Sequence, residues 1–165
     1  MAYKITTPLA GFQGIAVTDT VQNHPVGTIV QGDDPDYGGA EFIYLKGVAS
    51  TVVGSLVTYN TTSGTTALAP VGTNKPQPVA VAMSANVASQ WGWYQISGIA
   101  VVAKSATVSL AAGVAVGVKT VGLIASTGSG KELTGALVAA VASAATGRTT
   151  VQVVVNRPRM QGRIT

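Results

Sequence analysis

The sequence contains no cysteine among its 165 residues. This absence excludes disulfide bridges, thiolate zinc sites, iron–sulfur clusters and cysteine nucleophiles. The chain also has a single histidine, His24, so a multi-histidine metal site and a serine–histidine hydrolase have little support. The sequence accordingly predicts no metal, no cofactor and no catalytic residues, and we expect the protein not to be an enzyme.

Charge is the second scarcity, because only 10% of the residues are charged, against roughly 25% in a typical soluble domain. A hydrophobic share of 47% and a mean hydropathy of +0.39 predict a folded chain rather than a disordered one. The formal charge is −4 up to Glu41 and +8 beyond it. Two interpretations stay open: the acidic segment lies against a basic surface of a neighbouring copy or a partner, or both regions face water.

Long apolar runs are also missing. Residues 76–103 carry no charge over 28 positions, but Pro78, Asn86 and Gly92 interrupt them, whereas a transmembrane helix needs about 20 predominantly apolar residues in a row. The basic residues are spread singly and cluster only in the C-terminal tail, without the dense stripe and interleaved aromatic residues of a nucleic-acid site. We therefore expect no membrane and no nucleic acid among the partners.

What the sequence does contain is a series of short runs rich in valine and threonine. From Glu41 onward these runs follow one another at close spacing, among them EFIYLKGV, SLVTYN, PVAVAMS, IAVVAK and TTVQVVVNRP. The pattern predicts an all-β fold, either a compact β-sandwich or a barrel, jelly-roll-like or built as a tandem β-unit. We divide the chain into an extended N-terminal arm (1–40) with one short strand near Gly27–Gln31, a β-rich body (41–156) and a basic tail (157–165).

An internal comparison suggests that the body contains two related β-units, at about 47–97 and 98–156. A shift of 57 positions lays residues 78–97 on residues 135–154 and pairs Val81 with Val138 and Gln95 with Gln152. A similar match brings Gly54 near Gly113. Both segments would then be strand, small-residue turn and strand, which disfavours the helix that the alanine-rich stretch 135–145 otherwise favours. Chance similarity between alanine-rich segments is the alternative.

Two motifs resemble ligand sites, and each is better explained as a turn. The stretch STGSGKEL (126–133) resembles a phosphate-binding loop, but Ala125 stands where the first glycine belongs and Glu132 where a hydroxyl should follow the lysine. We predict a flexible surface loop there. The stretch DDPDYGG (33–39) holds three carboxylates, but its spacing is not that of an EF-hand loop. A turn built on aspartate and proline is predicted, with a cation site as the alternative.

The densest aromatic cluster is QWGWYQ (90–95). In a strand, Trp91 and Trp93 would point to one face and Tyr94 to the other. Core filling or a subunit contact is the prediction, and a sugar-stacking platform is the alternative. His24 precedes Pro25, which restricts its backbone to extended conformations. We expect a packing or hydrogen-bonding role for it.

A family resemblance follows from the order of these segments. A leading arm is followed by GAEFIYLKGVASTVVGSLVTYN, PVAVAMSANVASQWGWYQISG, VSLAAGVAVGV and ALVAAVASAATGRTTVQVVVNRP. This arrangement resembles the small capsid decoration (cement) proteins of tailed bacteriophages over most of Glu41 to Arg157. The long acidic arm departs from the family pattern.

The resemblance implies a β-rich, non-enzymatic virion protein on the outer surface of the capsid. Its partners would be the major capsid protein, whose neighbouring copies it bridges to stabilise the shell, and other copies of itself, as a dimer or trimer. The alternative is a carbohydrate- or receptor-binding β-module on a virion or cell surface. The expected partner-binding residues lie in the arm and the tail: Phe12, Ile15, Val17, Val21, His24, Asp33, Asp34, Asp36, Tyr37, Arg157, Arg159 and Arg163.

Overall fold

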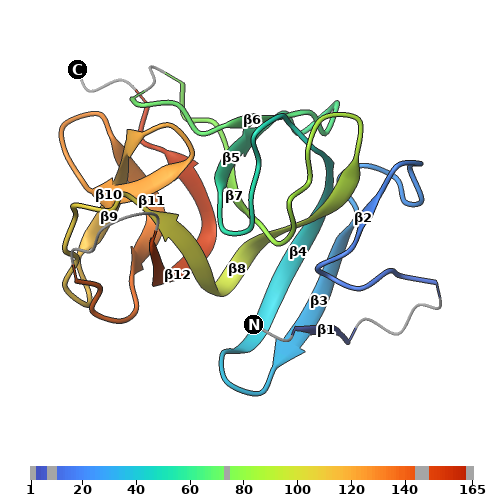
Figure 1. Cartoon of the computed structure of the whole chain (residues 1–165), viewed down its shortest axis with the longest axis horizontal. Coiled ribbons are helices and arrows are strands. Elements are labelled where there is room, and N and C mark those ends of the chain that lie inside the picture. The colour runs from blue at the N-terminus through green and yellow to red at the C-terminus, as the bar shows by residue number, and fades with distance from the viewer. Residues whose placement is uncertain (1–2, 7–10, 73–74, 144–148, 163–165) are drawn as a thin grey trace.

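The computed structural model describes residues 3–6, 11–72, 75–143 and 149–162. Within these residues all regular secondary structure elements are β-strands, which confirms the all-β prediction (Figure 1). The segment 135–145 is not helical where it is described, because it forms the end of one strand and a turn. The strands are β1 (Lys4–Ile5), β2 (Thr18–Asp19), β3 (Ile29–Asp34), β4 (Gly38–Lys46), β5 (Leu56–Tyr59), β6 (Thr66–Leu68), β7 (Val79–Ala82), β8 (Trp91–Lys104), β9 (Ala115–Thr120), β10 (Leu123–Ser126), β11 (Glu132–Val138) and β12 (Thr149–Met160).

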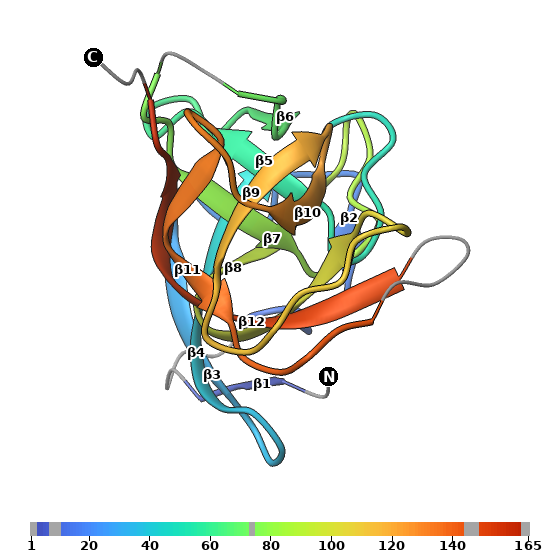
Figure 2. The ribbon, with the colours of Figure 1, turned by 90° about the vertical axis from the view of Figure 1, so that its left-hand side faces the viewer.

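The C-terminal half is a closed five-stranded barrel in the order β8, β10, β9, β11, β12 and back to β8 (Figure 2). β8 and β12 pair antiparallel from Lys104 opposite Thr149 to Ser97 opposite Asn156. The ring is completed by a parallel contact between Lys104 of β8 and Ile124 of β10. The sequence left a β-sandwich and a barrel open, and this half of the structure is a barrel.

The N-terminal half of the body repeats this strand order. β4 pairs with β8, β8 with β7, β7 with β5, and β5 with β6. A parallel bridge from Lys46 of β4 to Thr65, beside β6, joins the two ends of this row. It corresponds to the parallel contact of Lys104 with Ile124 in the second half. The two-unit hypothesis thus agrees with the pairing pattern, although the first unit begins at β4 and not at residue 47.

Strand β8 belongs to both halves and bends sharply between them (Figure 1). At the junction Gly98 has a left-handed φ of 96°. A Cβ atom there would lie 2.7 Å from the carbonyl oxygen of Gly39, so the close approach of β4 also requires glycine. Before the junction Tyr94 packs into the core of the first half, and after it Val102 packs into the barrel.

The two halves share a wall and form a single body. On β5 and β7, Val57 and Ala80 face the core of the first half, whereas Leu56 and Val81 belong to the apolar cluster of the barrel. The barrel cluster is almost entirely valine, alanine, leucine and isoleucine. A third cluster lies on the outer face of β4 and β8, around Phe42.

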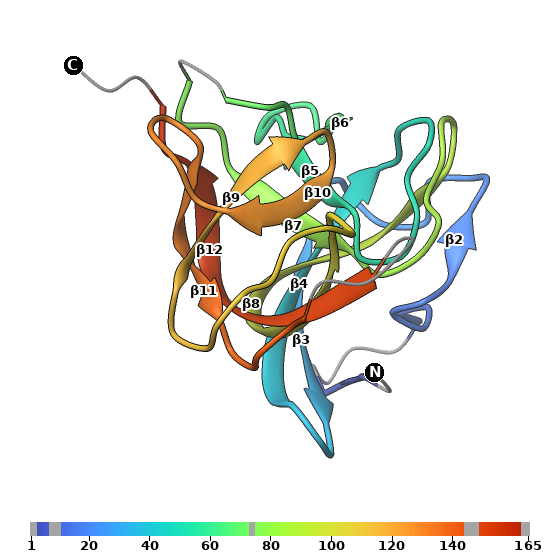
Figure 3. The same ribbon diagram turned by 60° about the vertical axis from the view of Figure 1, so that its left-hand side comes forward.

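The N-terminal segment, predicted as an extended arm, lies on this outer face of the body in its described part. Tyr3, Ile15 and Val30 are buried there. The predicted short strand is present as β3, which pairs along its full length with β4. Figure 3 shows the segment folded against the body beside β3 and β4. Apolar side chains of the arm that we expected to bind a partner are therefore largely buried against the protein's own body.

Candidate functional site

Four rings from the arm and the body form an aromatic cluster that holds the arm in place. Phe12 and His24 come from the arm, Tyr44 from β4 and Trp93 from β8. Neighbouring ring centroids lie 4.8 Å apart for Phe12 and His24, 5.0 Å for His24 and Tyr44, and 5.1 Å for Tyr44 and Trp93. Such tilted and edge-on pairs each contribute about 0.5–1.5 kcal/mol beyond area burial. Phe12 and His24, both expected to contact a partner, thus contact the protein's own body.

The hydroxyl of Tyr44 ties the arm to β4 by hydrogen bonds. It donates to Oδ2 of Asp19 at 3.2 Å and accepts from the backbone N–H of Asn23 at 3.4 Å. Burial raises the pKa of Tyr44, and the negative charge of Asp19 raises it further. The neutral phenol is therefore the form that this part of the fold requires.

Tyr3 and Gln95 form a second anchor, at the bend of β8, and sequence reasoning missed both. The Tyr3 hydroxyl donates to the carbonyl oxygen of Ile99 at 2.7 Å. The buried Gln95 amide donates to the carbonyl oxygens of Ser97 and Ile99, each at 3.0 Å. An amide side chain in the middle of an apolar strand was the available signal, because buried polar groups are nearly always hydrogen-bonded.

The outward side of the arm carries aliphatic side chains that remain exposed. Val17 is 47% exposed and Val21 is 69% exposed, whereas Ile15, predicted to contact a partner, is only 5% exposed. Val17 lies at a hollow of about 530 Å³ that is also lined by Tyr3, Val53 and Met83. Of the predicted apolar contact residues, Val17 and Val21 are therefore the ones that a partner can reach.

The DDPDYGG segment is the turn of the β3–β4 hairpin, as predicted. Asp34 is buried, and its Oδ1 accepts hydrogen bonds from the backbone N–H groups of Asp36 at 2.9 Å and Tyr37 at 3.2 Å. It therefore shapes the turn and does not face a partner. Asp33 and Asp36 are exposed. Tyr37 points to β12, where its hydroxyl accepts from Nε2 of Gln152 at 3.2 Å.

Of the described tail residues, 157–160 form the end of β12. Arg157 donates to Glu41 Oε2 at 3.1 Å, and the two side chains are 60% and 28% exposed. An exposed pair of this kind contributes less than about 1 kcal/mol. It shows one place where the acidic and basic regions meet within the chain itself. Arg159 is exposed on β12, and Arg163 lies outside the described residues.

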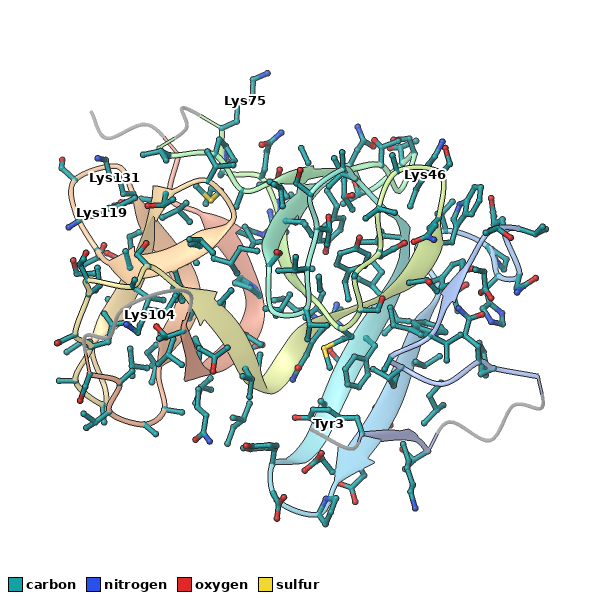
Figure 4. The ribbon with its side chains drawn as sticks, viewed as in Figure 1. Tyr3, Lys46, Lys75, Lys104, Lys119 and Lys131 are labelled. Atoms are coloured by element: carbon teal, nitrogen blue, oxygen red, sulfur yellow. The ribbon has the colours of Figure 1, made fainter. Side chains whose placement is uncertain are left out.

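Three lysines and two aspartates mark two separate places on the surface of the molecule. Lys119 and the half-buried Lys131 lie at the end formed by the β9–β11 loops, and Lys75 lies above them on the connection between β6 and β7 (Figure 4). Lys119 donates to Oγ of Ser126 at 2.9 Å. The exposed acids Asp33 and Asp36 lie at the tip of the β3–β4 hairpin, which projects from the opposite side (Figure 1). Bases are not confined to the first of these places, because the exposed Lys4 of β1 lies opposite Asp33 in the strand register.

Lys104 differs from these exposed lysines because its side chain is 1% exposed. Its ammonium group donates to the carbonyl oxygens of Ser105 at 3.1 Å, Ala106 at 3.5 Å and Val108 at 2.6 Å. Three carbonyls around one cation hold the loop after β8 closed over the end of the barrel. The side chain thus has a structural function.

The aromatic residues of QWGWYQ do not form an exposed row. Trp93 and Tyr94 are both 0% exposed and lie on opposite faces of β8, in different apolar clusters. Trp91 is half-buried beneath the ammonium group of Lys46, which lies 5.7 Å from its ring. The core-filling prediction is confirmed for Trp93 and Tyr94, and a sugar-stacking platform made of all three residues is wrong.

Among the described residues, no three histidine, aspartate or glutamate side chains come together as a metal site. The stretch STGSGKEL is the connection between β10 and β11, with Lys131 in a turn. No helix in the described part of the chain is long and apolar enough to cross a membrane. The features that can engage a partner are thus surfaces: the outward arm valines, the acidic hairpin tip and the basic end.

Comparison with known proteins found no family model that matches the chain and no curated protein that matches its sequence.

Proposed function

We propose that this protein is a structural component of a phage virion that binds the outer surface of the head. It bridges neighbouring major capsid proteins and so stabilises the shell, without enzymatic activity. The proposal rests on the resemblance of its segments to capsid decoration proteins and on the chemistry of its surface.

The observation that carries the proposal is the aliphatic character of the exposed surface. Valine, isoleucine and leucine side chains are exposed on the arm, on several strands and in several loops, and charged residues make up only 10% of the chain. Burying such a surface against neighbours costs little desolvation, because few charges have to leave water. A surface of this kind suits a protein that neighbouring subunits contact on several sides.

The arm has a narrower role in this proposal than its sequence suggested. Phe12, Ile15 and His24 hold the arm on the body, so the contact to the shell falls to Val17 and Val21 on its outward side. The exposed charges Asp33, Asp36 and Arg159 complete the proposed contact set. Asp34 is left out because its carboxylate shapes the turn.

The test is binding of the purified protein to undecorated heads of the phage that encodes it, measured by co-sedimentation. Removal of residues 1–40 is unsuitable, because it would also remove β3 and part of an apolar cluster. The double variant Val17→Asp/Val21→Asp keeps those contacts. We expect it to lose at least tenfold in affinity, because each new carboxylate has to be desolvated in the contact.

The matched control is Thr20→Asp, which adds a carboxylate at an exposed neighbouring position of the arm. Its binding should stay close to that of the unaltered protein. If the unaltered protein does not bind heads at all, the proposed function is wrong. If the double variant binds as tightly as the control, the arm has no part in the contact.

The alternative function, a carbohydrate- or receptor-binding module, depended on an exposed aromatic row. Burial of Trp93 and Tyr94 removes that row.

A further inference from the structure

The outer face of the barrel carries a row of aliphatic side chains, of which Leu137, Val141 and Val154 are exposed and Ile99 and Val101 are half-buried. Leu137 of β11 lies opposite Val154 of β12, and Val154 lies opposite Ile99 of β8. Directly paired residues point to the same side of a sheet, so these three side chains adjoin one another. Val101 and Val141 extend the row beside a hollow of about 320 Å³. We call these five residues the aliphatic face.

The aliphatic face is the counterpart of a covered surface in the first half. There the outer sides of β4 and β8 bear Phe42, Tyr44 and Trp93, all 0% exposed because the arm lies on them. On the barrel, Leu137 is 44% exposed, Val154 is 38% exposed and Val141 is 74% exposed. Because both halves use the same strand order, equivalent sheet faces are covered in one half and open in the other.

We propose that the occupant of the aliphatic face is the same face of a second copy, in a two-fold dimer. In a two-fold contact each patch meets itself. The end of the molecule with the exposed Lys75 and Lys119 would repel its own copy, and so would a contact that brought the exposed Asp36 of one hairpin tip against Asp36 of the other. The aliphatic face bears no charge at its centre, and this is the composition found in the buried centre of interfaces.

The rim of this face also complements itself. Thr150, Gln152 and Asn156 of β12 supply hydroxyl and amide groups around the aliphatic row. A stable dimer buries roughly 800 Å² per copy, about a tenth of the 7652 Å² surface. The aliphatic row therefore forms the centre of the contact and the polar rim its border.

The dimer is tested on the purified full-length protein by sedimentation velocity over a range of concentrations. The unaltered protein should sediment as a dimer. Val154→Asp places two carboxylates near the two-fold axis and should weaken the dimer by roughly a hundredfold or more. Val121→Asp is the control, because Val121 is 52% exposed in the turn between β9 and β10, outside the face. Circular dichroism and thermal unfolding check that both variants fold.

A second measurement uses the absence of cysteine. A single Val154→Cys substitution provides the chain with one thiol, which can form a disulfide only with another copy. Mild oxidation should give a covalent dimer for Val154→Cys and little for Val121→Cys. A protein that stays monomeric at its highest soluble concentration overturns the inference. So does a dimer that Val154→Asp leaves intact. Neither result bears on head binding, which is measured separately with the arm variants.

Discussion

The two halves of the body share a strand order but differ in how each apolar face is covered. The first half is joined end to end by the bridge from Lys46 to Thr65 and holds the large residue Tyr94 in its core. The second half is a closed ring of five strands filled mainly with valine and alanine. The two halves therefore enclose side chains of different size within the same strand order.

The outer faces of the two halves also differ in the size of their side chains and in how far they are exposed. Large aromatic residues cover the outside of the first half and require the arm to shield them, whereas the barrel presents smaller aliphatic residues without a cover. The same arrangement of strands can thus have its outer apolar face covered by another segment of its own chain, or leave that face for a neighbouring molecule to cover. Which of these applies depends on the residues of the outer face and on what lies next to it.

The largest effect is expected at the bend that separates the halves. Gly98→Ala places a Cβ atom 2.7 Å from the Gly39 carbonyl oxygen at a φ of 96°. Strain and overpacking together should lower the free energy of unfolding by about 2–5 kcal/mol. Urea unfolding measures the loss.

Arg157 is the matched position, because it also has a left-handed φ, of 45°, within a strand, β12. Arg157→Gly relieves the left-handed strain and removes one exposed ion pair, so its net effect should stay within about 1 kcal/mol. If the two variants lost the same free energy of unfolding, the left-handed residue in β8 would be no more important for the fold than the one in β12, which would contradict this prediction.

A somewhat smaller effect is expected from alkaline pH, through the core of the first half. Burial raises the pKa of Tyr94 to about 12, and Asn86 donates to its hydroxyl at 3.0 Å. The unfolded chain loses this proton near pH 10 and the folded chain near pH 12, so the stabilisation is complete below pH 10 and is lost as the pH rises. Two pKa units correspond to roughly 2.7 kcal/mol.

Tyr94→Phe should remove this contribution while lowering stability at neutral pH by about 1 kcal/mol, since the Asn86 hydrogen bond is lost. The free energy of unfolding is measured on both proteins between about pH 8 and pH 11, on either side of the ordinary tyrosine pKa of about 10. The two proteins should differ in how steeply this free energy falls with pH. Burial also raises the pKa of Tyr3, Tyr44 and Tyr59, so part of the alkaline loss will remain. Identical slopes for the two proteins would show that Tyr94 does not titrate with folding.

The smallest of the three effects compares two lysines that close corresponding ends of the halves. Lys104→Met leaves three carbonyl oxygens without their buried donor and should cost about 2 kcal/mol. Lys46→Met, at an exposed site, should change stability by less than about 0.5 kcal/mol. Chemical denaturation of both variants provides the comparison. A stabilised Lys104→Met protein would mean that desolvation of the ammonium group outweighs its hydrogen bonds.

Local pattern was sufficient for much of the fold. The strands β5 and β7 lie within the runs that predicted them, whereas β4 begins before its run, at Gly38, and β12 ends after its run, at Met160. The turn at 33–39 follows from its aspartate and proline. The opposite orientation of Trp93 and Tyr94 follows from the two-residue period of a strand.

The candidate contact residues were harder to predict, because exposure depends on distant parts of the chain. Val17 and Ile15 have similar chemistry and lie two positions apart in the arm, yet Val17 is exposed and Ile15 is buried. Tyr3 and Gln95 lie 92 positions apart and meet only because the arm returns to the bend of β8. No spacing within the arm identifies the strand on which it will lie.

The sequence by itself determined that the protein is all-β, that thiol chemistry is excluded, and that few charges are available for its surface. These properties are local or compositional, so they do not depend on which strands pair. The tertiary structure decided that the second half closes into a barrel, that the arm covers the first half, and that the aliphatic face of the barrel stays open. The physical reason is that many of these strands are apolar on both sides, so their alternation does not specify which side another segment will cover.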